Sequence, residues 1–423
     1  MTSTPETIRS AQAAEAEPET APALRALPSA TPPVTTIPTQ DLASHHAPLA
    51  EPLVEAFRRV LASGRYVSGD AGGEVRTFER EAARILGTSH AIGMSSGTDA
   101  LLAVLMAIGV SPGDTVVTTP FSFVATADVI VRLGARPVFA DVDPVTLNLD
   151  PEAARAAIGA ETRAVVGVHL FGRPCAGAAL RAACEPRGVS LIEDAAQAVG
   201  AVDTDGRPVG AIGQAAALSF FPSKNLGALG DAGMVLTNDG ALAATLRRLR
   251  VHGAGQRFVH QIIGGNFRLD ELQAALLRVK LPLLQTWNAA RRRLAALYRE
   301  RLAGLPLALP PDDAPGAVWN QFVVRVPRIG AGGGRARDAL ADALARDGVA
   351  TAVYYPAPLH LQPCFASLGH RRGDFPVAER ACDEVLALPI YPELRPADVA
   401  LIADRISRHF AGDQRVNRNP AKS

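Results

Sequence analysis

Short apolar runs alternate with helical patterns through the first half of the chain. The runs contain several β-branched residues, and each is followed by a stretch in which apolar residues recur at the helical period. The predicted strands cover residues 91–94, 115–118, 137–140, 164–169 and 190–192. The predicted helices between them cover residues 98–108, 124–133, 151–158 and 176–186. This alternation predicts an α/β fold with a large, mostly parallel sheet that helices cover on both faces.

The pattern extends on both sides of this repeat. Helices are expected at 51–63 and 74–86, strands at 216–220 and 233–237, and a further helix at 240–249. A long helical pattern over 269–295 is interrupted at Pro282, because proline breaks the helical hydrogen-bond ladder.

The pattern changes after Pro310, where a smaller α+β domain is expected. Its predicted elements are a strand at 321–326, a glycine-rich loop at 330–334, a helix at 337–346 and a strand at 350–354. The loop lacks the Lys-Ser/Thr that follows a phosphate-binding P-loop, which favours a surface turn. We therefore predict a large domain over residues 39–285 and a small C-terminal domain over 286–411.

The two ends of the chain lack these patterns. Residues 1–38 are rich in Ala, Pro, Thr and Glu without a period and are predicted to form a disordered leader, and residues 412–423 a flexible tail. The start has no basic region followed by an apolar core, and no apolar run is long enough to span a membrane. A cytoplasmic protein without a membrane partner is expected.

Composition narrows the function classes. The 423 residues carry a formal net charge of +1, which gives no electrostatic reason to expect a nucleic-acid or membrane-surface partner. The four cysteines form no Cys-x-x-Cys pair and have no histidines at ligand spacing. They are expected to be isolated reduced thiols, with no metal site.

Polar residues gather where the predicted strands end, which is where open parallel sheets bind ligands. The first group, residues 95–99, reads Ser-Ser-Gly-Thr-Asp and leads into a helix. Gly97 permits close approach of the backbone, and the free N–H groups near Thr98 suit a phosphate. A plain serine or threonine helix cap is the alternative.

The second group, residues 193–197, reads Glu-Asp-Ala-Ala-Gln and closes the strand at 190–192. A carboxylate there can cap a helix, bind a metal or take part in catalysis. Pyridoxal phosphate (PLP) needs one carboxylate against its pyridine nitrogen, so that the protonated ring can accept electrons. Asp194 suits that role, and Gln197 suits a hydrogen bond to the 3-oxygen of the ring or to the substrate.

The third group surrounds Lys224, a lysine that follows a predicted strand and lies among small and apolar residues. Loss of solvent lowers the pKa of a lysine and makes its amine nucleophilic, although an ordinary surface lysine is the alternative. Ser219, five residues earlier, would add a hydroxyl to a phosphate site.

Taken together, these segments closely resemble the DegT/DnrJ/EryC1/StrS family of sugar aminotransferases, from about residue 37 to 410. The stretches that carry the resemblance are SGTDALLA (96–103), FSFVATADVI (121–130), PVFADVDPVTLNLD (137–150), EDAAQAVGA (193–201), SFFPSKNLGALGDAG (219–233), GGNFRLDELQAALL (264–277) and YYPAPLHLQP (354–363). The resemblance implies the PLP-dependent transferase fold of aspartate aminotransferase, fold type I.

The resemblance also implies roles for individual residues. Lys224 matches the Schiff-base lysine and Asp194 the partner of the pyridine nitrogen, and Gln197 matches the residue beside the ring. The implied phosphate contacts are Gly97, Thr98, Ser219 and Asn266.

Three further implications concern the partner subunit, the stacked ring and the substrate. The family's equivalent of Asn266 is donated by the neighbouring subunit, which implies a homodimer with shared active sites. Phe123 matches the aromatic residue stacked on the cofactor, but a proline displaced by one place in residues 119–123 leaves Phe121 open for this role. His360 lies where the family often contacts substrate.

The implied reaction moves an amino group from L-glutamate to a nucleotide-linked keto-deoxysugar. Residues 226–231 read Leu-Gly-Ala-Leu-Gly-Asp, which is similar to relatives that aminate carbon 3 of a dTDP-3-keto-6-deoxyhexose. The alternatives are a 4-keto sugar or cyclitol substrate, a PLP-dependent lyase or dehydratase, and a PLP-binding regulatory protein without turnover. Dehydratase relatives replace the lysine by histidine, so Lys224 favours transamination.

Overall fold

The structure is a computed structural model, which describes residues 36–67, 73–256, 258–312, 314–327 and 335–417. Most of the predicted leader and the glycine-rich loop at 330–334 lie outside these ranges. The predicted ends need correction. Ile37 is buried, and its backbone pairs with Gly348 and Ala350 at 2.8 and 2.9 Å, so the folded chain begins before residue 39. The last helix continues to Asn417, past the predicted start of the tail at 412.

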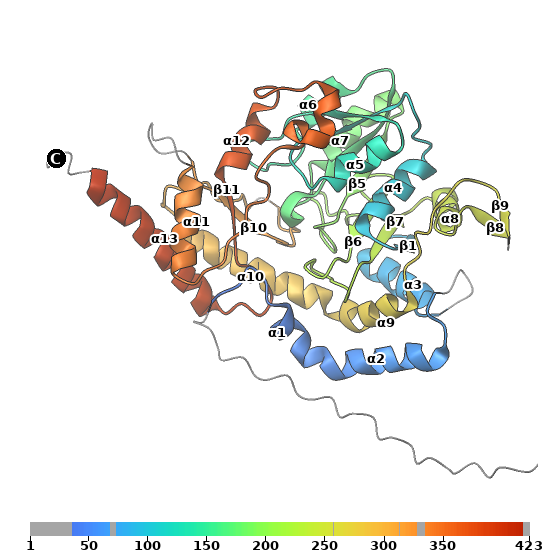
Figure 1. Ribbon diagram of the computed structural model, residues 1–423, viewed down its shortest axis with the longest axis horizontal. Coiled ribbons are helices and arrows are strands. Elements are labelled where there is room, and N and C mark those ends of the chain that lie inside the picture. The colour runs from blue at the N-terminus through green and yellow to red at the C-terminus, as the bar shows by residue number, and fades with distance from the viewer. Residues whose placement is uncertain (1–35, 68–72, 257, 313, 328–334, 418–423) are drawn as a thin grey trace, which may run out of the picture. The chain divides into compact units, whose positions relative to one another are not determined.

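A seven-stranded sheet forms the centre of the fold, in the order β1-β7-β6-β5-β4-β2-β3 (Figure 1). Its strands are β1 His90–Met94, β2 Thr115–Thr118, β3 Arg136–Phe139, β4 Thr162–Val168, β5 Ser190–Asp194, β6 Ala215–Ser219 and β7 Gly233–Thr237. Only β7 runs opposite to its neighbours β1 and β6. The other six strands therefore end at one edge of the sheet, and the predicted, mostly parallel sheet is confirmed.

Helices cover both faces of this sheet (Figure 1). One face packs against α4 Gly97–Ala107, α5 Ala125–Arg132 and α8 Gly240–Leu249. The other packs against α3 Glu74–Leu86, α6 Pro151–Ala157, α7 Gly177–Cys184 and α9 Glu271–Lys280. Alternate strand residues point to opposite faces, so Val165 joins one core cluster while Ala164 and Val166 join the other.

Sequence signals explain where these helices begin and end. In α3 the buried residues Val75, Phe78, Ala82 and Leu86 recur at the helical period, and the helix ends at Gly87, whose φ of 75° is left-handed. The N-terminal helices are α1 Leu42–His46 and α2 Ala50–Ser63, and a 3-10 turn at Ala47–Leu49 joins them. Leu53, Ala56 and Val60 of α2 pack on Ala275 and Leu276 of α9.

The C-terminal part has its own core. The break predicted at Pro282 is a 3-10 turn at Leu281–Leu283, after which α10 runs from Leu284 to Leu302. The C-terminal part then contains β10 Phe322–Arg325, α11 Ala336–Arg346, α12 Pro376–Glu384, β11 Val385–Leu388 and α13 Pro396–Asn417, with 3-10 turns at Leu359–Leu361 and Pro363–Leu368. Earlier in the chain, 3-10 turns lie at Leu170–Gly172 and Glu185–Arg187, and β8 Ala254–Gln256 pairs with β9 Val259–His260. The α+β character agrees with the prediction, while the predicted boundary at 285/286 falls within α10 and stays a prediction.

One predicted strand is wrong. Residues 350–354 form only a single bridge, between Ala352 and Ala387 beside β11. Pro356 and Pro358 have no N–H to donate, so a ladder cannot continue through this segment. β10 pairs with β11 instead, and β11, α12 and α13 were not among the predicted elements.

Candidate active site

Gly97 and Ser219 meet at the edge where the parallel strands end. A Cβ atom at Gly97 would lie 2.7 Å from the Cβ of Ser219, so only glycine fits between β6 and the start of α4. The Ser96 side chain caps α4 by accepting the Asp99 N–H at 3.0 Å, and Ser95 Oγ donates to the Asp99 carboxylate at 2.6 Å. Ser96 is therefore a helix cap, and the first turn of α4, which begins with Gly97 and Thr98, starts beside Ser219.

The adjacent carboxylates of β5 have different surroundings, because neighbouring strand residues point to opposite faces. Glu193 is fully buried and accepts the N–H groups of Gly210, Ile212 and Gly213 at 3.0, 3.1 and 2.8 Å. His169 Nδ1 accepts the Cys175 N–H, so its Nε2 is free to donate to Glu193 at 3.0 Å. Glu193 thus holds the fold together.

Asp194 faces the other side of β5, where it lies near Lys224. Its Oδ2 accepts the hydroxyl of Thr126 at 2.7 Å, and its Oδ1 accepts the Ala196 N–H at 3.2 Å. Thr126, in the first turn of α5, lies 3.0 Å from the Ser122 hydroxyl. These hydrogen bonds fix the direction of the Asp194 carboxylate. A carboxylate that keeps a proton on the ring nitrogen of a cofactor needs such a fixed direction.

Lys224 lies in a loop directly after β6 and is partly buried. Burial lowers the pKa of Lys224 to about 8, and the negative charge of Asp194 partly opposes this shift. The amine is therefore much easier to deprotonate than an ordinary lysine amine, which suits a nucleophile. The chain contains only two other lysines, Lys280 and Lys422.

Gln197 and Tyr355 complete this group from different parts of the chain. Gln197 Oε1 accepts the Phe171 N–H at 2.6 Å, and its Nε2 donates to the Tyr355 hydroxyl at 3.4 Å. Burial, followed by the charge of Asp194, raises the pKa of Tyr355, so its hydroxyl stays protonated at neutral pH. Tyr355 thus brings a hydroxyl donor from the C-terminal part to the predicted cofactor residues.

The two candidate stacking residues differ in exposure. Phe121 is 1% exposed and packs edge-on against Phe171 and Tyr355, so it belongs to the core. Phe123 is 58% exposed, which leaves its ring available to a ligand. The exposure favours Phe123 as the stacked residue, a role that stays a prediction.

Asn266 and His360 lie apart from this contact network. Asn266 is exposed and lines a surface cleft with Ser95 of its own chain. His360 is buried, with Nε2 3.1 Å from Glu379 and its ring against Phe375. These contacts are structural, so the predicted substrate contact of His360 gains no support from them, and the role of Asn266 across subunits stays a prediction.

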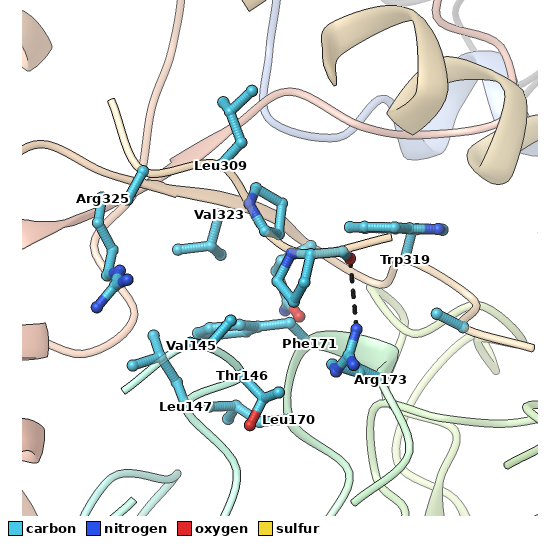
Figure 2. A pocket seen from close by; sticks show the side chains of 15 residues that line it. Val145, Thr146, Leu147, Leu170, Phe171, Arg173, Leu309, Trp319, Val323 and Arg325 are labelled. Carbon is cyan, nitrogen blue, oxygen red and sulfur yellow. Dashed lines mark hydrogen bonds between the residues drawn. The ribbon is translucent and has the colours of Figure 1, made fainter. Parts of the chain in front are cut away.

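A narrow cleft is lined by Phe171, whose backbone N–H donates to Gln197. Its volume is about 40 Å³, and Figure 2 shows Phe171 and Trp319 along it, with Arg325 and Arg173 at opposite ends. Arg173 donates to the carbonyl of Pro311 at 3.3 Å. Lys224 does not line this cleft. Lys224 instead lines a smaller cleft, of about 10 Å³, together with Gln40, Arg291 and Glu393.

Several residues of the site escaped the sequence analysis. Thr126 and Ser122 lie within the quoted stretch 121–130, and Tyr355 lies within 354–363, but nothing in their spacing shows a contact with Asp194 or Gln197. Phe171 carried no signal at all, since its role comes from a backbone N–H. Within the described residues, no group of His, Cys, Asp and Glu is arranged to hold a metal ion, and no helix there is long and apolar enough to cross a membrane.

The residues at this edge of the sheet suit pyridoxal phosphate. A lysine with a lowered pKa, an oriented carboxylate and a helix N-terminus packed against Ser219 are the groups that would hold its aldehyde, its ring nitrogen and its phosphate. With the sheet described above, they define the PLP-binding class of fold type I proteins.

The family follows from comparison with known proteins. The model of the DegT/DnrJ/EryC1/StrS aminotransferase family matches residues 49–407, and the chain belongs to this family. The predicted family, fold class and PLP cofactor are therefore confirmed.

Similar proteins carry enzyme names as well as regulatory or sensory names. The chain is 44% identical to the "Pleiotropic regulatory protein" of Geobacillus stearothermophilus, over 89% of this chain and 100% of that protein. It is 42% identical to the UDP-N-acetyl-3-dehydro-alpha-D-glucosamine 3-aminotransferase of Acidithiobacillus ferrooxidans, over 89% and 99%. It is 41% identical to the dTDP-3-amino-3,4,6-trideoxy-alpha-D-glucose transaminase of Streptomyces venezuelae, over 88% and 95%.

Solved structures show the same fold. The crystal structure of S. venezuelae DesV, in complex with a ketimine intermediate, matches with a TM-score of 0.84 and 40% identity, over 89% of this chain and 98% of that one. NtdA from Bacillus subtilis, with bound cofactor PMP, matches with a TM-score of 0.81 and 28% identity, over 90% and 86%.

Proposed function

We propose that this chain is an aminotransferase that moves an amino group from L-glutamate to carbon 3 of a nucleotide-linked keto-deoxysugar, preferably a dTDP-3-keto-6-deoxyhexose. The observation that carries the proposal is the convergence of Lys224, Asp194 and the start of α4 at one edge of the sheet. The enzyme names of two similar proteins support the sugar: both place nitrogen at carbon 3, one on a UDP sugar and one on a dTDP sugar.

Each residue has a defined task in this reaction. Bound PLP supplies a ring that accepts electrons from the carbon next to nitrogen. The amine of Lys224 anchors the cofactor and, once released, carries one proton between two carbon atoms as base and then as acid. The Asp194 carboxylate keeps a proton on the ring nitrogen, and Thr126 keeps that carboxylate in place. The first turn of α4, with Ser219, holds the phosphate.

The loop after Lys224 supports selection of the sugar carbon. Leu229 donates its N–H to Gln273 Oε1 at 3.0 Å, and its side chain is exposed. A Cβ atom at Gly230 would lie 2.8 Å from Gln273 Nε2, so the loop is closely packed on α9. A loop fixed in this way beside the amine can favour one carbon, because a misplacement of about 1 Å costs about a hundredfold in rate.

The substrate test offers the enzyme L-glutamate with dTDP-linked 3-keto and 4-keto 6-deoxyhexoses in parallel. We expect the 3-keto sugar to be aminated faster by at least about tenfold, a difference that one well-placed contact can supply. Mass spectrometry of the product and of 2-oxoglutarate measures both reactions. A clear preference for the 4-keto sugar would overturn the assignment to carbon 3 and leave the aminotransferase proposal standing.

A pH prediction tests the state of Lys224. The rate at which PLP attaches to the cofactor-free protein should rise with pH and reach half its maximum near pH 8, because burial lowers the pKa of Lys224 and only the neutral amine attacks the aldehyde. Asp194→Asn should move this midpoint to lower pH, since the carboxylate raises the pKa of the lysine. Stopped-flow absorbance measures the rate.

A matched control for this prediction is Lys280, whose pKa burial also lowers to about 8. Lys280→Gln should leave the midpoint unchanged, because that amine hydrogen-bonds the carbonyl of Gly227 instead of facing Asp194. A wild-type midpoint near 10.5, the ordinary value for lysine, would show that Lys224 is not desolvated.

A regulatory role is the second candidate function, since a protein 44% identical to this chain is named a pleiotropic regulatory protein. A regulator can bind PLP without turnover, whereas a transaminase converts its bound cofactor when glutamate is added. Lys224 disfavours only a dehydratase of the kind that replaces this lysine by histidine, and a PLP-dependent lyase or dehydratase would not leave the nitrogen of glutamate on the sugar.

The proposed assembly is a homodimer with shared active sites. The exposed apolar side chains of Phe221 and Leu229 support it, because they lie in the loop around Lys224 and a second copy would cover them. Asn266 would then reach the partner's phosphate site. The cytoplasmic location stays a prediction.

A further inference from the structure

Lys224 lies in a loop that folds tightly back on itself. At its base, the Ala228 N–H donates to the Phe220 carbonyl at 2.7 Å, and the Lys224 N–H donates to the Phe221 carbonyl at 2.8 Å. The loop has a first limb, residues 221–225, and a second limb, residues 226–229. A Cβ atom at Gly227 would lie 2.2 Å from the Pro222 carbonyl oxygen, so the two limbs touch. Displacement of either limb would therefore move Lys224.

Amide side chains hold the first limb. Gln40 Nε2 donates to the Ser223 carbonyl at 2.9 Å. Asn225 donates to Asn288 Oδ1 at 2.7 Å and accepts from Asn320 Nδ2 at 2.8 Å. These partners come from the N-terminal segment, from α10 and from the chain just before β10, so the limb is fixed from three directions.

A charged side chain holds the second limb at Gly227, next to the hydrogen bonds that Ala228 and Leu229 donate through their backbone N–H groups. Lys280, the last residue of α9, has no exposed surface. Its ammonium donates to the carbonyl of Gly227 and to His46 Nε2, which lies 2.8 Å away. The His46 ring lies 5.3 Å from the ring of His45 at a tilt of 57°, and His45 Nδ1 lies 2.7 Å from Glu393.

The surroundings of Lys280 do not neutralise its charge. Burial alone lowers its pKa to about 8, with no contribution from a carboxylate, so the amine is still mainly charged at neutral pH. Burial and the nearby Lys280 lower the pKa of His46 to about 4, so His46 is a neutral acceptor. An uncompensated buried charge destabilises a fold, and an apolar side chain of similar size would avoid that penalty. A lysine at this place therefore indicates a need for the hydrogen bond that it donates.

We propose that Lys280 is a positioning residue, whose hydrogen bond to the carbonyl of Gly227 holds the loop so that the amine of Lys224 meets the reacting carbon. It acts through the loop and not through its charge, because Lys280 does not contribute to the pKa shift of Lys224. This inference rests on the proposed role of Lys224 in amino transfer.

The test compares two neutral replacements of similar length. Lys280→Met removes the donor, whereas Lys280→Gln keeps an N–H that can reach the carbonyl. In the holoenzyme we expect Lys280→Met to slow the single-turnover reaction with glutamate by about tenfold to a hundredfold, as displacement of the amine would. Lys280→Gln should remain within about threefold of wild type, since it restores the same contact. Glutamate affinity should change little in either variant.

Two further measurements separate positioning from stability. The pH midpoint of the cofactor's absorbance should shift in Lys280→Met and not in Lys280→Gln. Arg278→Met is the matched control: Arg278 lies on the same helix and pairs with Glu74 and with Glu81, the latter at 2.9 Å. That variant should lose thermal stability and keep the wild-type rate and midpoint.

The inference is overturned if the Met and Gln variants behave alike, whether both match the wild type or both are equally slow. Lys280→Leu provides a second donor-free variant if the Met protein is not recovered folded. Failure of the wild type itself to convert its cofactor with glutamate would instead overturn the proposed function, so the two failures are distinguishable.

Discussion

Replacing Lys224 by alanine is expected to abolish amino transfer and leave the protein folded. The substitution removes both the anchor of the cofactor and the group that carries the proton, and proton transfer by a placed side chain alone is worth up to about ten-thousandfold. We expect a loss of at least that size. The fold should survive, because the amine is a partly buried group whose burial is unfavourable to its charged form.

Borohydride reduction followed by mass spectrometry measures the anchor directly. In the wild type it should fix the cofactor to the peptide that contains Lys224, and in Lys224→Ala it should fix none. Lys280→Gln is the control and should be labelled like the wild type. Cofactor fixed to the Lys224→Ala chain, for instance at Lys280, would show that the anchor lies elsewhere.

The second large effect is expected for Asp194→Asn, which should bind PLP and react about a hundredfold to a thousandfold more slowly, the usual consequence of removing a group that stabilises developing charge. An amide still accepts the Thr126 hydroxyl but cannot hold a proton on the ring nitrogen. The single-turnover rate with glutamate and the spectrum of the bound cofactor measure the effect.

The neighbouring carboxylate provides a sharp contrast. Glu193→Gln should lower the free energy of unfolding by about 1–3 kcal/mol. Both carboxylate oxygens of Glu193 accept backbone N–H groups, and the NH₂ group that replaces one of them in glutamine cannot accept a hydrogen bond. The folded fraction should react at nearly the wild-type rate. An Asp194→Asn protein with most of its activity, or a Glu193→Gln protein as slow as Asp194→Asn, would contradict the assignment of roles to the two carboxylates.

Sequence periodicity predicted the sheet well, because the strands are short, mostly buried runs and β1 to β4 are each followed by a helix. It predicted β7, Gly233–Thr237, as a strand but could not predict that this strand runs antiparallel, because so short a sequence does not indicate strand direction. The strand predicted at 350–354 was wrong for a different reason: its apolar residues are partly buried by packing against the core, and only Ala352 pairs with β11.

Residue type at a strand end was enough to propose Asp194, Gly97 and Lys224 as site residues, and their roles stay predictions. Contacts made across the chain could not be predicted in this way. Thr126 supports Asp194 from α5, and Tyr355 reaches Gln197 over a sequence distance of 158 residues. His360 is buried against Glu379, and its predicted contact with substrate stays a prediction.

The most direct test of the proposed function follows the nitrogen atom. Holoenzyme is incubated with ¹⁵N-labelled L-glutamate and a dTDP-linked 3-keto-6-deoxyhexose, and the sugar nucleotide is analysed by mass spectrometry. Amino transfer through Lys224 predicts that the label appears in the sugar together with an equal amount of 2-oxoglutarate, in the wild type and not in Lys224→Ala. The proposed function is contradicted if wild-type enzyme that is fully loaded with cofactor transfers the label neither to this sugar nor to its 4-keto counterpart.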